Sequence, residues 1–319
     1  MLATALNILQ LVIALPYLFI IATQSPPELH IYRNTLLNYS FWFFLWLIWL
    51  ESFRVPLIDV IDHALCFALD GLASVAFPYD LYANLAIMII IVNNFIFSLV
   101  ICFFYRYCQL AHPNVISKLS SHHGILFWTA IYTTSLVVSF FMAHEAATIM
   151  TEKRVGGTLY ACINHEVPSK VYLFVTICCI IYSPACCSMV VLTFLCVKFL
   201  RKRRSIMTTR TYRLQLLLTA NLISLLVLPF LFDGIPFMVI LSLAFLEHPS
   251  LVPVGEVAMK IPLVDGILTC VVTVGFITPY RMCVYRFLRR LAKALRCNKQ
   301  LFKYTSSVSP ENPGSNSNV

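Results

Sequence analysis

The sequence predicts an all-α membrane protein built as a bundle of seven transmembrane helices. Charged residues fill only 12% of the 319 positions, whereas apolar residues reach 60% and the mean hydropathy is +0.82. A soluble domain carries about twice as much charge. The apolar runs are long and do not alternate with polar residues, which is typical of membrane helices and not of barrel strands. The chain is therefore expected to cross a membrane several times.

Seven apolar runs come close to or exceed the ~20 residues that cross a bilayer. The connections between them contain Pro, Gly, His and charged residues, as loops do. In chain order the predicted spans are Ala5–Ala22, Leu36–Ser52, Leu81–Phe104, Gly124–Met142, Val171–Leu200, Leu214–Phe245 and Val257–Thr278.

The first two runs need a separate justification. The first could be a cleaved signal peptide, but residues 1–10 contain no Lys or Arg, so the positive stretch of such a peptide is missing. We therefore expect it to remain as a span. The second run is unusually rich in Trp and Phe. Its helix can extend as far as Ile58, because Pro56 does not forbid a helix near a membrane end.

The sixth run is longer than one crossing requires. Leu214–Phe245 holds 32 residues and is interrupted at Pro229 and again at the stretch Asp233-Gly234-Ile235-Pro236. One interpretation splits it into two spans, but the ten residues after Pro236 are too few to cross alone. We expect a single kinked helix whose outer end projects past the bilayer.

Basic residues predict the orientation. With the N-terminus outside, 18 of the 23 Lys and Arg residues fall on the cytoplasmic side and five fall outside. The positive-inside rule therefore favours an N-terminus outside, a C-terminus inside and an odd number of spans. The net charge of +9 is then explained by cytoplasmic loops beside anionic lipid, and no nucleic-acid binding is expected.

The chain divides into three predicted parts. Residues 1–281 form the helical bundle, 282–304 form a basic amphipathic eighth helix along the inner leaflet, and 305–319 form a disordered tail. Cys283 at the start of this helix and Cys297 at its end are candidates for palmitoylation, with unmodified thiols as the alternative.

Four stretches carry a resemblance to a known family. They are IYRNTLLNYSFWFF from Ile31, FFYRYCQLAHP from Phe103, TTRTYRLQLLLTANLISLLVLPFLFDGIP from Thr208 and TPYRMCVYRFLRRL from Thr278. In this order they resemble the nematode serpentine chemoreceptors of the Str superfamily, nearest the Srh type. The resemblance implies a G-protein-coupled chemosensory receptor in the plasma membrane, in the sensory cilium of a neuron.

The resemblance also implies a coupling site at the cytoplasmic end. Arg106, flanked by Tyr105 and Tyr107, is expected to meet a heterotrimeric G protein, and Arg281 is a second candidate. The alternative for Arg106 is an interfacial arginine that snorkels between belt tyrosines. No acidic residue precedes Arg106, so the ionic lock of rhodopsin-like receptors is not expected here.

Polar residues inside the spans are candidates for a ligand pocket, because ionisable groups in a membrane are costly. The candidates are Asn93, Asn94, Asp233, Asp265 and Lys260. Each has an alternative. Asp233 can hydrogen-bond to backbone groups that the kink leaves unpaired, and Asp265 can pair with Lys260. The two asparagines can join neighbouring helices by hydrogen bonds.

Two cysteines in outer loops, Cys66 and Cys162, would face an oxidising compartment. A disulfide between them would tie the second outer loop to the loop before the third span and constrain the mouth of the pocket.

The predicted function is therefore that of a receptor whose partners are a small molecule, a G protein and membrane lipid. We expect no cofactor, no metal and no catalysis, since His144-Glu145 lacks the second His of a zinc protease motif. The alternatives are a transporter, which would show matched broken helices in two halves, and a ligand-gated channel subunit, whose N-terminus would lie inside.

Overall fold

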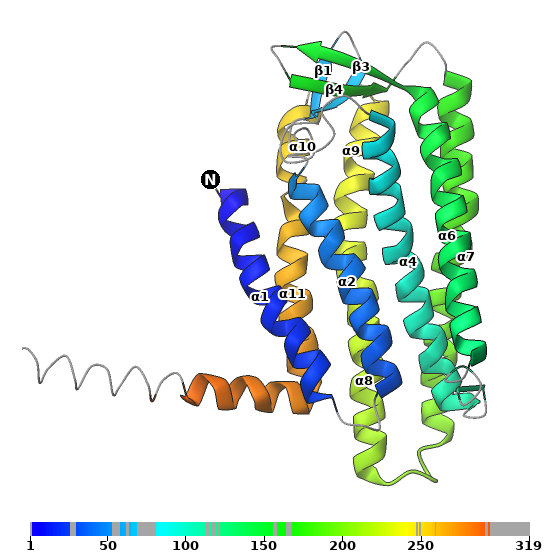
Figure 1. Ribbon diagram of the computed structural model, residues 1–319, viewed down its shortest axis with the longest axis vertical. Helices are drawn as coiled ribbons and strands as arrows, with labels where there is room; N and C mark the ends of the chain where they lie inside the picture. The colour runs from blue at the N-terminus through cyan, green and yellow to red at the C-terminus, as the bar shows by residue number, and fades with distance from the viewer. Residues whose placement is uncertain are drawn as a thin grey trace, which may run out of the picture.

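A computed structural model describes residues 2–25, 30–52, 58–61, 64–68, 81–112, 115–116, 119, 122–155, 158–163, 168–246, 248, 250–258, 260–290 and 293. Long helices run side by side along one axis (Figure 1). They are α1 (Leu2–Gln24), α2 (His30–Ser52), α4 (Leu81–Ala111), α6 (His122–Ile149), α7 (Pro168–Lys202), α8 (Thr209–Pro229) continued by η2 (Phe230–Gly234) and α9 (Ile235–Phe245), and α11 (Ile261–Phe276). They correspond in order to the spans that the sequence predicts.

Four helices of the described part are long and apolar enough to cross a membrane by length and composition alone. They are Tyr82–Ala111, Gly124–Ile149, Ser169–Lys202 and Thr209–Leu243, and a fifth is added if the bent pair Val264–Phe276 and Thr278–Arg290 counts as one. In α1, the residues with described side chains form an apolar helix, Leu9–Gln24. The 23 residues of α2 include polar and aromatic side chains that lower its apparent hydropathy and that suit a helix packed among others.

Several helices extend beyond the apolar runs that predicted them. The helix α4 continues past Phe104 to Ala111, and α2 begins at His30, before Leu36. Backbone hydrogen bonding does not stop where apolar sequence stops, because Arg, Gln and Tyr are also compatible with a helix. As a result Arg106 lies inside α4 and not at its end.

The sixth predicted span is continuous, and its predicted interruption is a change of helix type. At Phe230–Gly234 the helix widens into a five-residue π-helical turn, and the Ile235 N–H donates to the Phe230 carbonyl. Pro229 and Pro236 flank this turn, and each lacks the N–H that an α-helix needs. A π turn absorbs such a defect without breaking the helix.

The seventh predicted span, Val257–Thr278, is divided in the structure. A short helix α10 (Leu251–Ala258) precedes α11, which starts next to Pro262. At the other end Ile277 is extended, and the chain turns by 103° into the helix Thr278–Arg290. This last helix projects sideways from the bundle (Figure 1).

A four-stranded antiparallel sheet covers one end of the bundle (Figure 1) and was not predicted from the sequence. Its strands are β1 (Ile58–Ile61), β2 (Ala64–Ala68), β3 (Met150–Val155) and β4 (Thr158–Ile163), in the order β1-β2-β4-β3. We call this end of the bundle the sheet end. Strands of four to six residues carry little periodic signal, and the pairing of β2 with β4 is not local.

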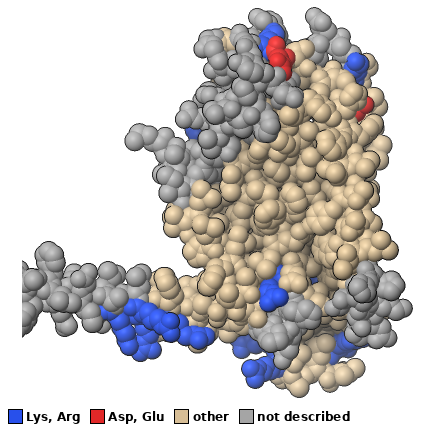
Figure 2. All heavy atoms as spheres, in the orientation of Figure 1, with Lys and Arg blue, Asp and Glu red and all other residues tan. Residues whose placement is uncertain are grey.

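The opposite end is rich in basic residues, and we call it the basic end. Figure 2 shows Lys and Arg side chains gathered there and along the sideways helix, with the visible acidic side chains near the sheet end. The basic end includes the end of α7, the turn that follows it and the start of α8, with Lys198, Arg201, Lys202, Arg203, Arg204, Arg210 and Arg213.

The largest buried cluster lies among α1, α2, α4, α8 and α11. Aromatic rings of α2 and α4 form its centre, where Phe43 packs against Tyr39 at 5.8 Å and against Phe95 at 5.5 Å between ring centroids. By contrast α6 and α7 expose much of their apolar surface, as helices that face lipid do.

Candidate functional site

Arg106 is buried inside the basic end, between α4 and α8. Its side chain is only 1% exposed. Nη2 donates to the backbone carbonyl of Gln215 at 2.5 Å and to the Thr219 hydroxyl at 3.2 Å, and Nε donates to the same hydroxyl at 3.3 Å. Nη1 donates to Gln109 Oε1 at 2.9 Å. We call Arg106, Gln109, Gln215 and Thr219 the arginine latch.

The latch holds a buried charge with neutral acceptors. A guanidinium taken out of water is costly unless its donors are satisfied, and here an amide, a hydroxyl and a carbonyl accept them. Hydrogen bonds from a charged donor are stronger than neutral ones. The latch therefore fastens α8 to α4 through neutral acceptors. No acidic residue stands beside Arg106 in the sequence, so these acceptors take the role that a carboxylate would have.

The two tyrosines beside Arg106 anchor α4 to other helices. The Tyr105 ring stacks on Trp128 of α6 at 5.9 Å between centroids, and the Tyr107 ring meets Phe199 of α7 edge-on at 5.8 Å. Tyr105 is buried and Tyr107 is partly buried. Their contacts fix the rotation of α4 and so keep Arg106 directed at α8.

Further polar contacts join helices near the latch. Asn221 of α8 donates to the Tyr32 hydroxyl of α2 at 2.9 Å, and the hydroxyls of Ser25 and Tyr280 lie 2.6 Å apart. Sequence reasoning missed these residues together with Thr219. Thr219 and Asn221 could have been identified as candidates, because they are polar residues two positions apart in an otherwise apolar stretch.

The candidate coupling residue Arg281 lies apart from the latch, exposed on the sideways helix. Cys283 on the same helix is half-buried and unpaired with another cysteine. Cys297 lies outside the described residues.

Asn93 and Asn94 both tie α4 to its neighbours. Asn93 is fully buried, donates to the Ser139 hydroxyl of α6 at 2.8 Å and accepts from the Tyr182 hydroxyl of α7 at 2.7 Å. Asn94 accepts from the Ser135 hydroxyl of α6 at 3.1 Å. The two asparagines thus use their side chains within the bundle, on the side of α6 and α7.

The two candidate acids lie on elements that pack against each other on the other side of the bundle. Asp233 belongs to η2 and Asp265 belongs to α11. Neither oxygen of Asp233 and only one oxygen of Asp265 has a hydrogen-bond donor among the described residues. Asp265 is 0% exposed, and its hydrogen-bonding neighbour is Thr269. Lys260 precedes α11 at its N-cap position and makes no hydrogen bond to Asp265 Oδ2.

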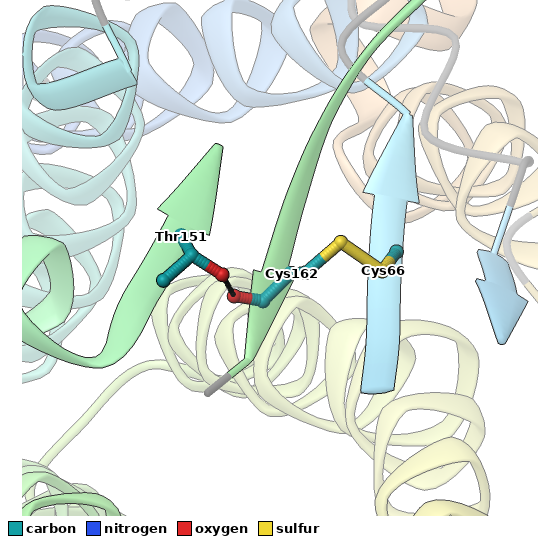
Figure 3. Close-up of a disulfide and its surroundings, with 3 residues drawn as sticks. All are labelled: Cys66, Thr151 and Cys162. Carbon is teal, nitrogen blue, oxygen red and sulfur yellow. Dashed lines mark hydrogen bonds between the residues drawn. A yellow bond between two sulfur atoms is a disulfide. The ribbon is translucent and has the colours of Figure 1, made fainter. Parts of the chain in front are cut away.

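Cys66 and Cys162 form a disulfide within the sheet (Figure 3). They are direct partners in the β2–β4 pairing, and their Cα atoms lie 4.0 Å apart. The Thr151 hydroxyl of β3 donates to the Cys162 carbonyl at 3.4 Å. The bond joins residues separated by 96 positions, so the two loops above the bundle form one layer.

A membrane helix bundle with a disulfide-bonded sheet at one end and a buried arginine at the basic end defines a seven-helix protein of the serpentine class. The chain belongs to the Srh family of these proteins, since the family model described as serpentine type 7TM GPCR chemoreceptor Srh matches residues 1–290. This match covers every long helix of the bundle and the sideways helix. No individually curated protein matches the sequence.

Proposed function

We propose that the protein is a chemoreceptor of the plasma membrane that binds a small extracellular molecule near the sheet end and activates a heterotrimeric G protein at the basic end. Membership of a chemoreceptor family supports this proposal. The orientation that it requires, with the sheet end outside, is supported by the disulfide, which suits an oxidising compartment, and by the basic residues at the other end.

The observation that carries the proposal is the arginine latch. A G protein can reach the basic end of the bundle only if α8 moves away from α4, and the hydrogen bonds from Arg106 to Gln215 and Thr219 oppose this movement. We infer that the latch stabilises the resting arrangement. A ligand that binds the open arrangement more tightly shifts the population toward it, and the released guanidinium then offers its donors to the G protein.

The helix α8–η2–α9 connects the two ends in this proposal. Because its π turn keeps the helix continuous, a displacement near the sheet end can reach Thr219 as a movement of one body. The sideways helix, with Arg281, Arg286, Arg289 and Arg290 exposed, suits contact with anionic lipid. Palmitoylation of Cys283 or Cys297 would strengthen that contact. A sensory cilium is the proposed location.

The experiment compares three variants in cells that report G-protein dissociation. Thr219→Val removes one acceptor of the latch and should raise ligand-independent signalling. Arg106→Ala should abolish signalling, because the proposed G-protein contact is lost. The double variant should be as silent as Arg106→Ala, and cell-surface labelling should show equal amounts of all proteins. The comparison of ligand-independent signalling among these variants needs no identified ligand.

Two results would contradict the proposal. The first is undiminished signalling by the double variant, which would exclude Arg106 as a coupling residue. The second is a ligand-evoked current or solute uptake with no G-protein response, which would favour the channel or the transporter.

A further inference from the structure

We propose that Tyr39 of α2 supplies the hydrogen-bond donor that Pro229 removes from α8, and that this contact holds α8 in its resting position. The inference rests on the proposed function for its effect on signalling, whereas the contact itself does not depend on that function. It starts from the proline, which lies where α8 passes into the π turn of η2.

Pro229 leaves one backbone carbonyl of α8 without its usual donor. In an α-helix the carbonyl of Leu225 would accept from the N–H of residue 229, and proline has no N–H. The next carbonyl along the chain, that of Leu226, accepts from the Phe230 N–H. Leu225 is 0% exposed, so solvent does not reach its carbonyl. A buried acceptor without a donor is costly in a membrane bundle.

The Tyr39 hydroxyl donates in place of the missing N–H. It lies 3.4 Å from the Leu225 carbonyl oxygen, which is its only hydrogen-bond partner among the described residues. Tyr39 is itself fully buried, and a buried phenol needs a partner. The hydroxyl and the carbonyl therefore satisfy each other, as groups of neighbouring helices do where a proline interrupts a membrane helix.

The Tyr39 ring is fixed by aromatic neighbours that do not belong to α8. It stacks on Phe43 of α2 at 5.8 Å and lies 5.6 Å from Phe95 of α4 between ring centroids. All three rings are part of the largest buried cluster. The donor is therefore held by α2 and α4, and it does not follow α8 when that helix moves.

Tyr39 and the arginine latch hold α8 at two levels. Leu225 lies six positions beyond Thr219, which is about 9 Å along the helix axis. A helix that bends at a proline moves the carbonyl four residues earlier away from the proline ring. Bending of α8 at Pro229 thus displaces the Leu225 carbonyl from the fixed hydroxyl of Tyr39. The contact opposes this bending and so acts as a second restraint on α8.

The test begins with thermal unfolding of the purified full-length protein in lipid nanodiscs. Tyr39→Phe removes only the hydroxyl and should lower the Tm by about 1–3 °C, the size expected for one interhelical hydrogen bond in a membrane. Pro229→Ala gives the Leu225 carbonyl a backbone N–H. In the Pro229→Ala background, Tyr39→Phe should leave the Tm unchanged or raise it, because the phenol no longer has a partner to lose.

Tyr32→Phe is the matched control on α2. Tyr32 lies seven positions before Tyr39, on the same face of the helix. Its hydroxyl accepts from Asn221 of α8 at 2.9 Å, and no proline is involved in that bond. Tyr32→Phe should therefore lower the Tm by the same amount with and without Pro229→Ala.

Two further measurements concern the restraint on α8. In cells that report G-protein dissociation, Tyr39→Phe should raise ligand-independent signalling about three-fold at equal surface labelling. Adding Pro229→Ala should return it to the level of Pro229→Ala alone. Hydrogen–deuterium exchange of residues 230–234 in nanodiscs should increase in Tyr39→Phe, and this comparison with the wild type is valid even if Pro229→Ala fails to fold.

Three results would each overturn the proposal. They are an equal loss of Tm from Tyr39→Phe in both backgrounds, unchanged exchange of residues 230–234 in Tyr39→Phe, and wild-type signalling by Tyr39→Phe in cells where Thr219→Val raises it. The first two measurements use no G protein. They therefore decide on the contact even if the signalling experiment on Arg106 fails.

Discussion

A hydrogen bond of 2.5 Å joins Nη2 of Arg106 on α4 to the backbone carbonyl of Gln215 on α8. The same carbonyl accepts from the Thr219 hydroxyl at 2.9 Å, and that hydroxyl in turn accepts from Arg106. Because one acceptor belongs to the main chain, no substitution at position 215 deletes it. The helices must separate for this bond to break, so the latch depends on the position of α8 as a whole.

The first prediction concerns the side-chain part of this latch. Thr219→Val keeps the shape of the side chain and removes the acceptor of Nε and Nη2. A hydrogen bond to a charged group contributes about 1.5–3 kcal/mol, so the resting population should fall and ligand-independent signalling should rise roughly ten-fold. An assay of G-protein dissociation in cells measures this ligand-independent signalling.

Thr176→Val on α7 is the matched control. Thr176 makes the same kind of bond to the carbonyl four residues earlier, Thr176 to Tyr172 at 2.8 Å, but it is exposed. Its signalling should stay at the wild-type level. A similar rise in both variants would mean that loss of any helical hydroxyl, and not of the latch, activates the protein.

The second prediction concerns the disulfide. Cys66→Ala should lower the free energy of unfolding by about 2–4 kcal/mol, since the bond closes a loop of 96 positions. Thermal unfolding with and without a reducing agent measures this, and the variant should be insensitive to the reductant. Cys179→Ala, an exposed free cysteine of α7, should leave the Tm and its response to reductant unchanged.

The third prediction concerns the contact between α7 and α4. Tyr182→Phe removes the hydroxyl that donates to Asn93 at 2.7 Å and leaves a buried amide oxygen without that donor. Interhelical hydrogen bonds in membranes contribute about 0.6–2 kcal/mol, so the Tm should fall by a few degrees. Tyr172→Phe, on the exposed side of α7, should not change the Tm. Equal values for the two variants would argue against a tie through Asn93.

The fourth prediction compares two glycines of α11. A Cβ at Gly266 would stand 2.7 Å from Leu47 Cδ1 and 2.9 Å from the Gln10 amide, whereas a Cβ at Gly275 would meet nothing within 4 Å. Gly266→Ala should therefore destabilise the protein by about 1–3 kcal/mol. Gly275→Ala should be neutral or stabilising, because Ala favours a helix. The two Tm values, measured side by side, check this difference.

The sequence predicted most of the long helices because each of these contains an apolar run, and hydropathy needs no knowledge of the neighbours. The family resemblance is confirmed by the match over residues 1–290. Interhelical contacts were harder to foresee. The sequence around Arg106 does not predict its contact with Thr219, because the two residues are 113 positions apart. The hydrogen bond between them depends on how α4 and α8 pack.

The sheet and the π turn show two other limits. The pairing of β2 with β4 joins segments that are individually too short for a periodic signal, so the pattern that identifies helices could not find it. Pro229 and Pro236 did indicate an irregular helix. Whether such a helix kinks at its prolines or widens into a π turn depends on local packing. In this protein the π turn contains Asp233.

The chemistry of the latch has a consequence for how the resting protein responds to acid. An arginine held by a carboxylate loses its partner when the proton concentration rises enough to neutralise that carboxylate. Arg106 is held by an amide, a hydroxyl and a main-chain carbonyl, none of which gains or loses a proton in the range that a cell experiences. Acidification within this range should therefore leave this contact closed, and a change in its strength has to come from movement of the helices.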